Sequence, residues 1–142
     1  MPTSTPVVVL LGFAAWTLLI LFGSVGIYRW SRILTGRASI AEWRADIPQG
    51  CDWYQRAIRA HMNCLENLPV YTALVVALMS TGLQGPWIDR LCVGMLVARV
   101  GQSIIHIVHS PTNTTVGLRF AFFLLQVVSM VSIGATIAMH VI

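Results

Sequence analysis

Residues 6–28 read PVVVLLGFAAWTLLILFGSVGIY, and this stretch decides the fold class. It contains no charged side chain, and its only polar breaks are Thr17 and Ser24, whose hydroxyls can bond to the backbone of their own helix. About 20 consecutive apolar residues are enough for a helix to cross the hydrocarbon core of a bilayer. The stretch lacks a positively charged start and is too long for a signal peptide, so it predicts a retained membrane span.

Three further spans follow by the same criterion. The second is polar from Asp52 through Glu66 and Asn67 and then turns apolar over residues 68–83. It contains Pro69, which a membrane helix tolerates when its neighbours cover the freed carbonyl group. The four expected spans cover approximately residues 6–28, 53–82, 87–109 and 115–140.

Glycine and proline mark the turns between the last three spans. The sequence GLQGP at 82–86 predicts a tight loop, and SPTN at 110–113 predicts another turn, after which Asn113 or Thr114 is the expected helix cap. The chain shows no internal repeat. It is therefore expected to be an all-α membrane protein, with a single domain of four transmembrane helices over residues 1–142.

The composition supports a protein surrounded by lipid. Apolar residues make up 56% of the chain and charged residues 10%, whereas a soluble domain carries about 25% charged residues. The net charge is +4 and every basic residue is arginine, but the arginines are dispersed along the chain, so no nucleic-acid partner is expected. The three cysteines have no paired spacing, and the histidines of the polar helices fall on different faces, so neither a disulfide framework nor a metal site is expected.

The distribution of arginine predicts the orientation in the membrane. The connection between the first two spans, residues 29–51, carries four arginines, while the short termini carry none. By the positive-inside rule this connection is cytoplasmic. Four spans then place the third connection on the cytoplasmic side and both termini on the opposite side.

The second span carries a polar stripe. Because a helix turns about 100° per residue, its polar residues at helical spacing fall within one sector of about 100°. These residues are Arg56, Arg59, Asn63, Glu66 and Asn67.

The third span has a sparser polar face, and the fourth contributes one arginine near its start. The residues are Arg99, Gln102, His106 and His109 on the third span and Arg119 on the fourth. With the expected topology, the three polar faces converge near the cytoplasmic side.

Two interpretations of this constellation remain open. A charge at membrane depth costs at least about 2.5 kcal/mol, so it persists only when it is paired or lines a wet cavity. In the first interpretation Glu66 neutralises Arg59 or Arg99, and the amide side chains tie the helices together. In the second, four arginines facing one glutamate leave an excess of positive charge that suits an anionic ligand.

The stretch RAHMNCLENLP at residues 59–69 closely resembles the signature of the MAPEG family, the membrane-associated proteins in eicosanoid and glutathione metabolism. The resemblance extends to Arg99 and its neighbours and to LRFAFF at 118–123, which look most like bacterial members. It implies a homotrimer in a bacterial inner membrane. Glutathione, as co-substrate, or a similar thiol would bind between neighbouring subunits near the cytoplasmic face.

The resemblance also implies roles for the polar residues. Arg59, Asn63 and Glu66 match the residues that contact glutathione in the family, where an arginine can grip a carboxylate and a glutamate can accept from an amino group. The remaining candidates for glutathione binding share the same polar faces; they are Arg56, Asn67, Arg99, Gln102 and His106.

The chemistry implied by the resemblance is that of a transferase or peroxidase. A thiolate stabilised by arginine attacks a lipophilic electrophile or a lipid hydroperoxide that arrives from the bilayer. Well-studied members place the arginine near the start of the fourth helix, where this chain has Asn113; the nearest arginine, Arg119, is therefore the candidate catalytic residue.

Two alternatives to an enzyme are a non-catalytic trimer of the same fold that binds lipid or another ligand, and a small transporter or channel subunit. Asn113 favours the first alternative. The absence of broken helices in repeated halves argues against the second.

Overall fold

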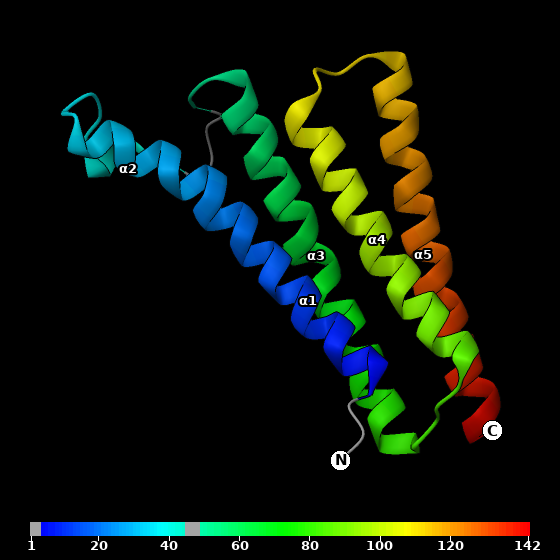
Figure 1. The fold of residues 1–142 in the computed structure, drawn as a ribbon. Coiled ribbons are helices and arrows are strands. Elements are labelled where there is room, and N and C mark those ends of the chain that lie inside the picture. The colour runs from blue at the N-terminus through cyan, green and yellow to red at the C-terminus, as the bar shows by residue number, and fades with distance from the viewer. Residues whose placement is uncertain (1–3, 45–48) are drawn as a thin grey trace.

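The computed structural model describes residues 4–44 and 49–142, and within them it is all-helical (Figure 1). Four of its helices are long and apolar enough to cross a membrane, as the sequence predicts. The first span is continuous from Thr5 to Leu34. Its parts are α1 (Thr5–Ile20), a π-helical stretch η1 (Leu21–Gly26) and α2 (Ile27–Leu34). The others are α3 (Asp52–Thr81), α4 (Pro86–Val108) and α5 (Asn113–Val141), and a short 3-10 helix η2 (Ile40–Glu42) precedes α3.

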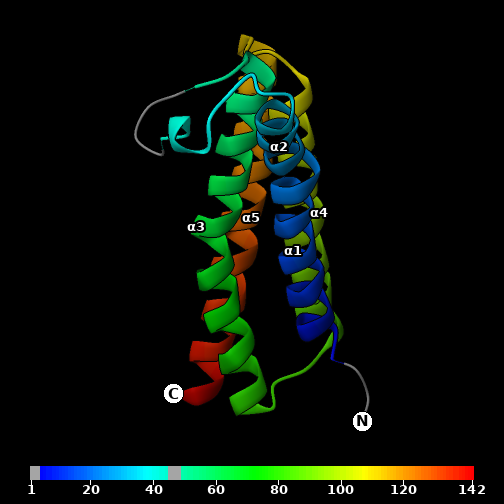
Figure 2. The same ribbon diagram turned by 90° about the vertical axis from the view of Figure 1, so that its left-hand side faces the viewer.

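The bundle has two distinct ends. The α4–α5 turn, the start of α3 and the arginine-bearing helix α2 lie at one end, which we call the arginine end (Figure 1). The α3–α4 turn, the start of α1 and the end of α5 lie at the other, the terminal end (Figures 1 and 2). This arrangement agrees with the alternation of four spans expected from the sequence.

Two local details differ from the expectations. Helix α2 continues past Tyr28 and includes Arg29 and Arg32, because no glycine or proline occurs between Ile27 and Gly36, whose φ of 69° lies just beyond the end of the helix. Helix α5 is capped by Thr112 rather than by Asn113 or Thr114. The Thr112 side chain accepts from the backbone N–H of Thr115 at 3.2 Å, and the Thr115 hydroxyl accepts from the backbone N–H of Thr112 at 2.8 Å, which is a capping box.

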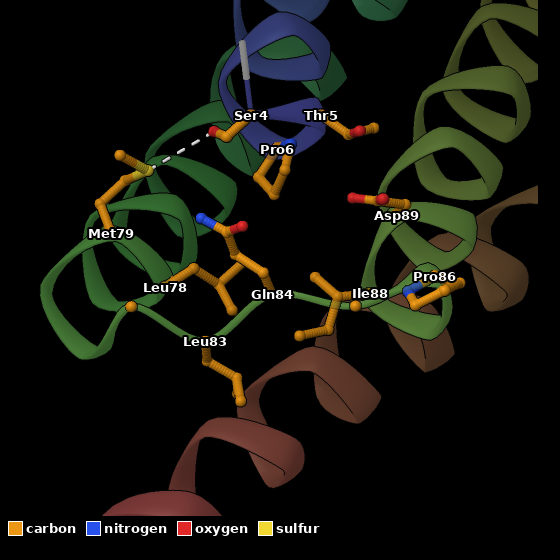
Figure 3. Close-up of a pocket in the computed structure, with 12 residues that line it drawn as sticks. Ser4, Thr5, Pro6, Leu78, Met79, Leu83, Gln84, Pro86, Ile88 and Asp89 are labelled. Carbon is orange, nitrogen blue, oxygen red and sulfur yellow. Dashed lines mark hydrogen bonds between the residues drawn. The ribbon is translucent and has the colours of Figure 1, made fainter. Parts of the chain in front are cut away.

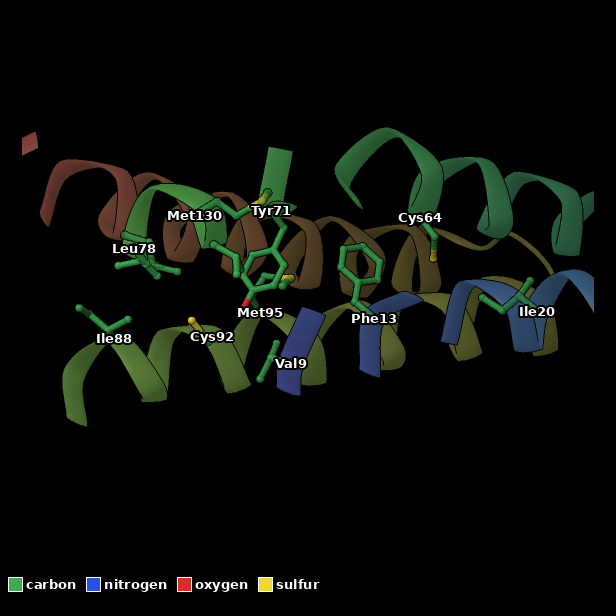
Figure 4. Packing of buried hydrophobic residues seen from close by; sticks show 12 residues of the cluster. Val9, Phe13, Ile20, Cys64, Tyr71, Leu78, Ile88, Cys92, Met95 and Met130 are labelled. Atoms are coloured by element: carbon green, nitrogen blue, oxygen red, sulfur yellow. The ribbon is translucent and has the colours of Figure 1, made fainter. Parts of the chain in front are cut away.

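The core lies where the first span, α3 and α4 meet, and Met130 and Ile133 of α5 complete it (Figure 4). Phe13 of α1 is fully buried and lies 6.4 Å from the Tyr71 ring of α3, measured between ring centroids. Met95 of α4 is equally buried beside them. Aromatic, aliphatic and sulfur-containing side chains thus fill the middle of the bundle, and polar groups are concentrated nearer the arginine end.

Helices α4 and α5 pack closely because a glycine lies between them. A methyl group added at Gly101 would lie 3.1 Å from Cζ and 3.2 Å from Cε1 of Phe122. Small residues allow membrane helices to approach in this way, since lipid supplies little hydrophobic drive for helix association. The close approach brings the polar side chains of α4 within reach of α5.

An aromatic cluster fixes the start of α3 against α2 at the arginine end. The rings of Tyr28 and Tyr54 stack with centroids 4.3 Å apart, and Trp43 packs edge-on against both. Arg29 donates from Nε to the Tyr54 hydroxyl, and its guanidinium lies 5.5 Å from the Trp43 ring centroid. Gly50, at φ 87°, is required here because a Cβ would meet Tyr54 Cδ1 at 2.6 Å.

Candidate functional site

A groove of about 320 Å³, lined by polar residues and by apolar surface, opens between α3, α4 and α5 in the half of the bundle nearer the arginine end. Its volume is at the lower end of the range for small-molecule sites. Its lining residues are Asn63, Glu66, Asn67, Arg99, Gln102, His106, Val116, Arg119, Phe120 and Phe123. Seven of these are polar residues that the sequence analysis places on the second, third and fourth spans, so the polar faces of the three helices converge on this groove.

The α3 wall of the groove supplies amides and one carboxylate. Asn67 donates from Nδ2 to the backbone oxygen of Asn63 at 2.9 Å, which is a bond within its own helix. Glu66 is exposed, and among residues 4–44 and 49–142 it makes no hydrogen bond or ion pair. Glu66 therefore forms no direct ion pair with Arg59 or Arg99 among the described residues, but it is near enough to Arg99 to interact with it electrostatically. The interpretation in which Glu66 neutralises Arg99 stays a prediction.

Arg99 is the central group of the α4 wall. Its side chain is only 1% exposed, and Nη1 donates to Oε1 of Gln102 at 2.9 Å. Nε and Nη2 are buried without any acceptor. The guanidinium carbon lies 5.8 Å from the centroid of the Phe13 ring, so the side chain's other neighbour is an aromatic face. Nε and Nη2 together form the side-on fork with which arginine grips a carboxylate, and here that fork has no protein partner.

A network of amides connects Arg99 to α5. Gln102 accepts from Arg99, accepts from Nε2 of Gln126 at 3.0 Å, and donates from its own Nε2 to the backbone oxygen of Arg119 at 3.2 Å. The sequence reasoning missed Gln126. It stands seven residues after Arg119, two helical turns along the same face, and this spacing was the available signal.

The α5 wall combines charge with apolar aromatic surface. Arg119 is half-buried and lines the groove beside Phe120 and Phe123, which are 62% and 40% exposed. His106 of α4 lines it from across the groove. The groove thus carries two arginines against the single carboxylate of Glu66, and it has an apolar rim on the side of α5.

Arg56 and Arg59 lie next to this groove rather than in its lining. Arg56 donates from Nε to the backbone oxygen of Ile107 at 3.2 Å, near the end of α4, where helix carbonyls lack partners. Arg59 is exposed on α3. In a single chain both side chains are therefore outside the groove wall.

Neither of two other kinds of site coincides with the groove. In the part of the chain that the structure describes, no three His, Cys, Asp or Glu side chains gather as metal ligands. A second cavity, of about 380 Å³, lies at the terminal end between the ends of α1, α3 and α4 (Figure 3). The charged residue in its lining is Asp89, and the Ser4 hydroxyl donates to Met79 Sδ at 3.5 Å. An anion suits the groove, with its two arginines, better than this cavity.

Comparison with known proteins agrees with this geometry. Residues 6–139 match the sequence profile of the MAPEG family, which is nearly the whole chain. The chain belongs to the MAPEG family. No curated protein and no solved structure matches it. MAPEG membership together with four apolar helices establishes an integral, multi-pass membrane protein. The family includes glutathione transferases and peroxidases and also non-catalytic members.

Proposed function

We propose that this MAPEG protein is a membrane-bound, glutathione-dependent transferase or peroxidase that acts on lipophilic electrophiles or lipid hydroperoxides. The observation that carries the proposal is the buried guanidinium of Arg99, a residue of the groove wall, whose Nε and Nη2 have no hydrogen-bond acceptor among the described residues. A buried cation without a partner is costly, and an anionic ligand offsets that cost when it binds.

Glutathione matches the groups that the groove presents. It has two carboxylates for arginine forks, an ammonium group for the Glu66 carboxylate, and peptide amides for the side chain of Asn63. Gln102 and His106 add hydrogen-bonding groups on the α4 wall. The arginine side chains that line the groove attract the carboxylates of glutathione, so the tripeptide is expected to bind there rather than in the terminal cavity.

Arg119 is the proposed partner of the thiolate. A guanidinium next to the glutathione sulfur stabilises the thiolate over the thiol and so raises the fraction of the nucleophilic form. In a transferase step the sulfur forms a bond to an electrophilic carbon, the bond from that carbon to its leaving group breaks, and the leaving group departs with the electron pair. In a peroxidase step the sulfur attacks the terminal oxygen of the hydroperoxide and the O–O bond breaks; the sulfur keeps the OH group as a sulfenic acid, and the alkoxide takes up a proton and leaves as the alcohol. The exposed rings of Phe120 and Phe123 provide an apolar surface along which a lipophilic substrate can approach from the bilayer.

A homotrimer fits the exposure of the α3 stripe. Arg59 and Glu66 are exposed on a helix predicted to cross the membrane, and Glu66 lies near its middle. A carboxylate facing lipid is costly, so a neighbouring copy of the chain is the proposed cover for this face. Arg56, Arg59 and Asn67 would then meet glutathione at the boundary between subunits.

The proposed setting is a bacterial inner membrane with the arginine end in the cytoplasm. The support is the positive-inside rule, since Arg29, Arg32 and Arg37 lie at this end and the terminal end carries Arg90 alone among arginines. Glutathione is then bound from the compartment in which it is made.

The experiment is an ultraviolet difference spectrum of glutathione added to purified protein in detergent at neutral pH. A thiolate band in the wild type, lost in Arg119→Ala and Arg59→Ala but kept in the terminal-end control Arg90→Ala, is the expected result. A spectrum with no thiolate band, while glutathione still binds by calorimetry, contradicts the enzymatic proposal.

A non-catalytic binding protein of the same fold is the second candidate. It is favoured by Asn113, because enzymes that this sequence resembles have an arginine in that region, whereas Asn113 is exposed outside the groove lining. The same spectrum separates the candidates, since a binding protein takes up its ligand without activating a thiol.

A further inference from the structure

We propose that Gln126 is a positioning residue for the ligand, because it fixes the amide of Gln102 and, through it, the orientation of the Arg99 fork. This inference rests on the proposed function. Gln126 itself is not part of the groove lining. It therefore acts through other side chains.

The hydrogen bonds around Gln102 agree on a single orientation of its amide. Arg99 has only donors, and the Nε2 group of Gln126 is also a donor, so both require the oxygen of Gln102. On the other side, the backbone oxygen of Arg119 is an acceptor and requires the nitrogen of Gln102. A flipped amide would oppose donor to donor at two contacts and acceptor to acceptor at the third. The orientation is thus set by three independent partners, and Gln126 is one of them.

Gln126 is itself held in place. It is 1% exposed, and its Nε2 donates both to Gln102 and to the backbone oxygen of Phe122, each at 3.0 Å. The second bond joins the side chain to its own helix. A rigid α5 scaffold therefore presents one donor to Gln102 at a fixed point.

The consequence lies at Arg99. The bond from Nη1 to Gln102 and the contact with the Phe13 ring together restrain the guanidinium, and Nε and Nη2 remain without an acceptor as a fork. If Gln126 could not donate, Gln102 would keep only two of its three bonds and could reorient toward other acceptors. The fork would then lose its fixed direction, and a carboxylate would have to order it during binding.

A purely structural role for Gln126 does not account for its hydrogen-bonding pattern as well as the positioning role does. Its own Oε1 atom is buried without a hydrogen-bond partner, so an apolar residue of similar length would remove one unsatisfied atom from the core. If Gln126 only held two helices together, an apolar side chain could do the same without burying an unsatisfied oxygen. The geometry is instead suited to aiming Gln102.

The test compares Gln126→Met with Ser129→Ala. Ser129 is a matched control because it is also buried on α5, about one turn away, and its hydroxyl bonds only to Leu125 of its own helix, at 2.8 Å. Titration calorimetry of glutathione into the full-length protein in detergent gives the dissociation constant. Gln126→Met is expected to weaken binding by about three- to tenfold, the effect of about one hydrogen bond, while Ser129→Ala leaves it unchanged.

A double-mutant cycle that combines Gln102→Met with Gln126→Met distinguishes the positioning role from a general loss of packing, because only the positioning role predicts non-additive losses of glutathione affinity. If Gln126 acts through Gln102, then Gln102→Met with Gln126→Met binds glutathione no more weakly than Gln102→Met alone. If the methionine variant does not fold, Gln126→Asn replaces it, since the shorter side chain stays polar but cannot reach Gln102.

The outcomes separate the two proposals. The positioning role is overturned if the wild type binds glutathione and Gln126→Met binds it equally tightly. It is also overturned if the losses of affinity caused by Gln126→Met and Gln102→Met simply add in the double variant. In both cases the proposed function still stands. Wild type that binds no glutathione overturns the proposed function, and the positioning role with it, because there is then no ligand to be positioned.

Discussion

Replacing Arg99 by methionine is expected to leave the ligand-free protein about as stable as the wild type. Methionine has similar length and can pack against Phe13, which lies under the guanidinium. Arg99 is buried and forms no ion pair among the described residues, so the substitution does not strand an opposite charge. Gln102 also keeps its bond from Gln126, so no new unpaired acceptor is created.

The expected change in the free energy of unfolding caused by Arg99→Met follows from the contacts that Arg99 makes. The two unpaired donors, Nε and Nη2, each cost about 1–3 kcal/mol, and methionine removes both. Against this, the bond to Gln102 contributes about 1.5–3 kcal/mol and the contact with Phe13 about 0.5–2 kcal/mol. The midpoints of these ranges are a gain of about 4 kcal/mol and a loss of about 3.5 kcal/mol, so the two nearly cancel. Removing one partner of a buried ion pair, by contrast, costs about 3–5 kcal/mol.

The assay is thermal or denaturant unfolding in detergent, with and without glutathione. At a hundred times its dissociation constant, glutathione should stabilise the wild type by about 2.7 kcal/mol and Arg99→Met not at all. A loss of more than about 3 kcal/mol in ligand-free Arg99→Met would refute the reasoning, because Arg99 would then be part of the structural framework and not a site kept for an anion.

Three further predictions test the packing, the cap and the topology. Gly101→Val should destabilise the bundle by about 1–3 kcal/mol because its side chain overlaps Phe122, whereas Gly94→Val, where a Cβ meets nothing within 4 Å, should be nearly neutral in the same unfolding assay. Thr112→Ala should cost about 1 kcal/mol through loss of the α5 cap; an unchanged unfolding midpoint would mean that the capping box contributes nothing. A membrane-impermeant maleimide should label exposed Cys51 in inverted but not in right-side-out vesicles, while the two buried cysteines stay unlabelled; the reverse pattern would invert the proposed orientation.

The spans could be predicted because membrane helices must satisfy their backbone internally, so apolar length alone locates them. The positions at which these helices begin and end were harder to predict. The extension of the first helix through Arg32 to Leu34 depends on where the next glycine allows a left-handed turn, and the sequence pattern gives no apolar signal there. The α5 cap depends on a reciprocal bond between Thr112 and Thr115, in a stretch where several residues could serve as caps.

The groove could be predicted in outline because helical phase places polar residues on one face. Asn63, Glu66 and Arg119 all reach it as expected. Which polar groups pair could not be predicted, since that depends on the separation of α4 and α5 to within an ångström. The sequence left open whether Glu66 neutralises an arginine. The structure gives Arg99 an amide partner, leaves its Nε and Nη2 without an acceptor, and has Glu66 interact with it electrostatically but not by a direct ion pair.

The measurement that tests the central claim most directly is titration calorimetry of glutathione into the wild-type protein and into Arg99→Met, both in detergent at neutral pH. Saturable binding by the wild type, lost in a folded Arg99→Met variant, is the result that the account predicts. Equal binding by both proteins would show that the Arg99 fork is not the anion site, and no binding by the wild type would contradict a glutathione-binding groove altogether.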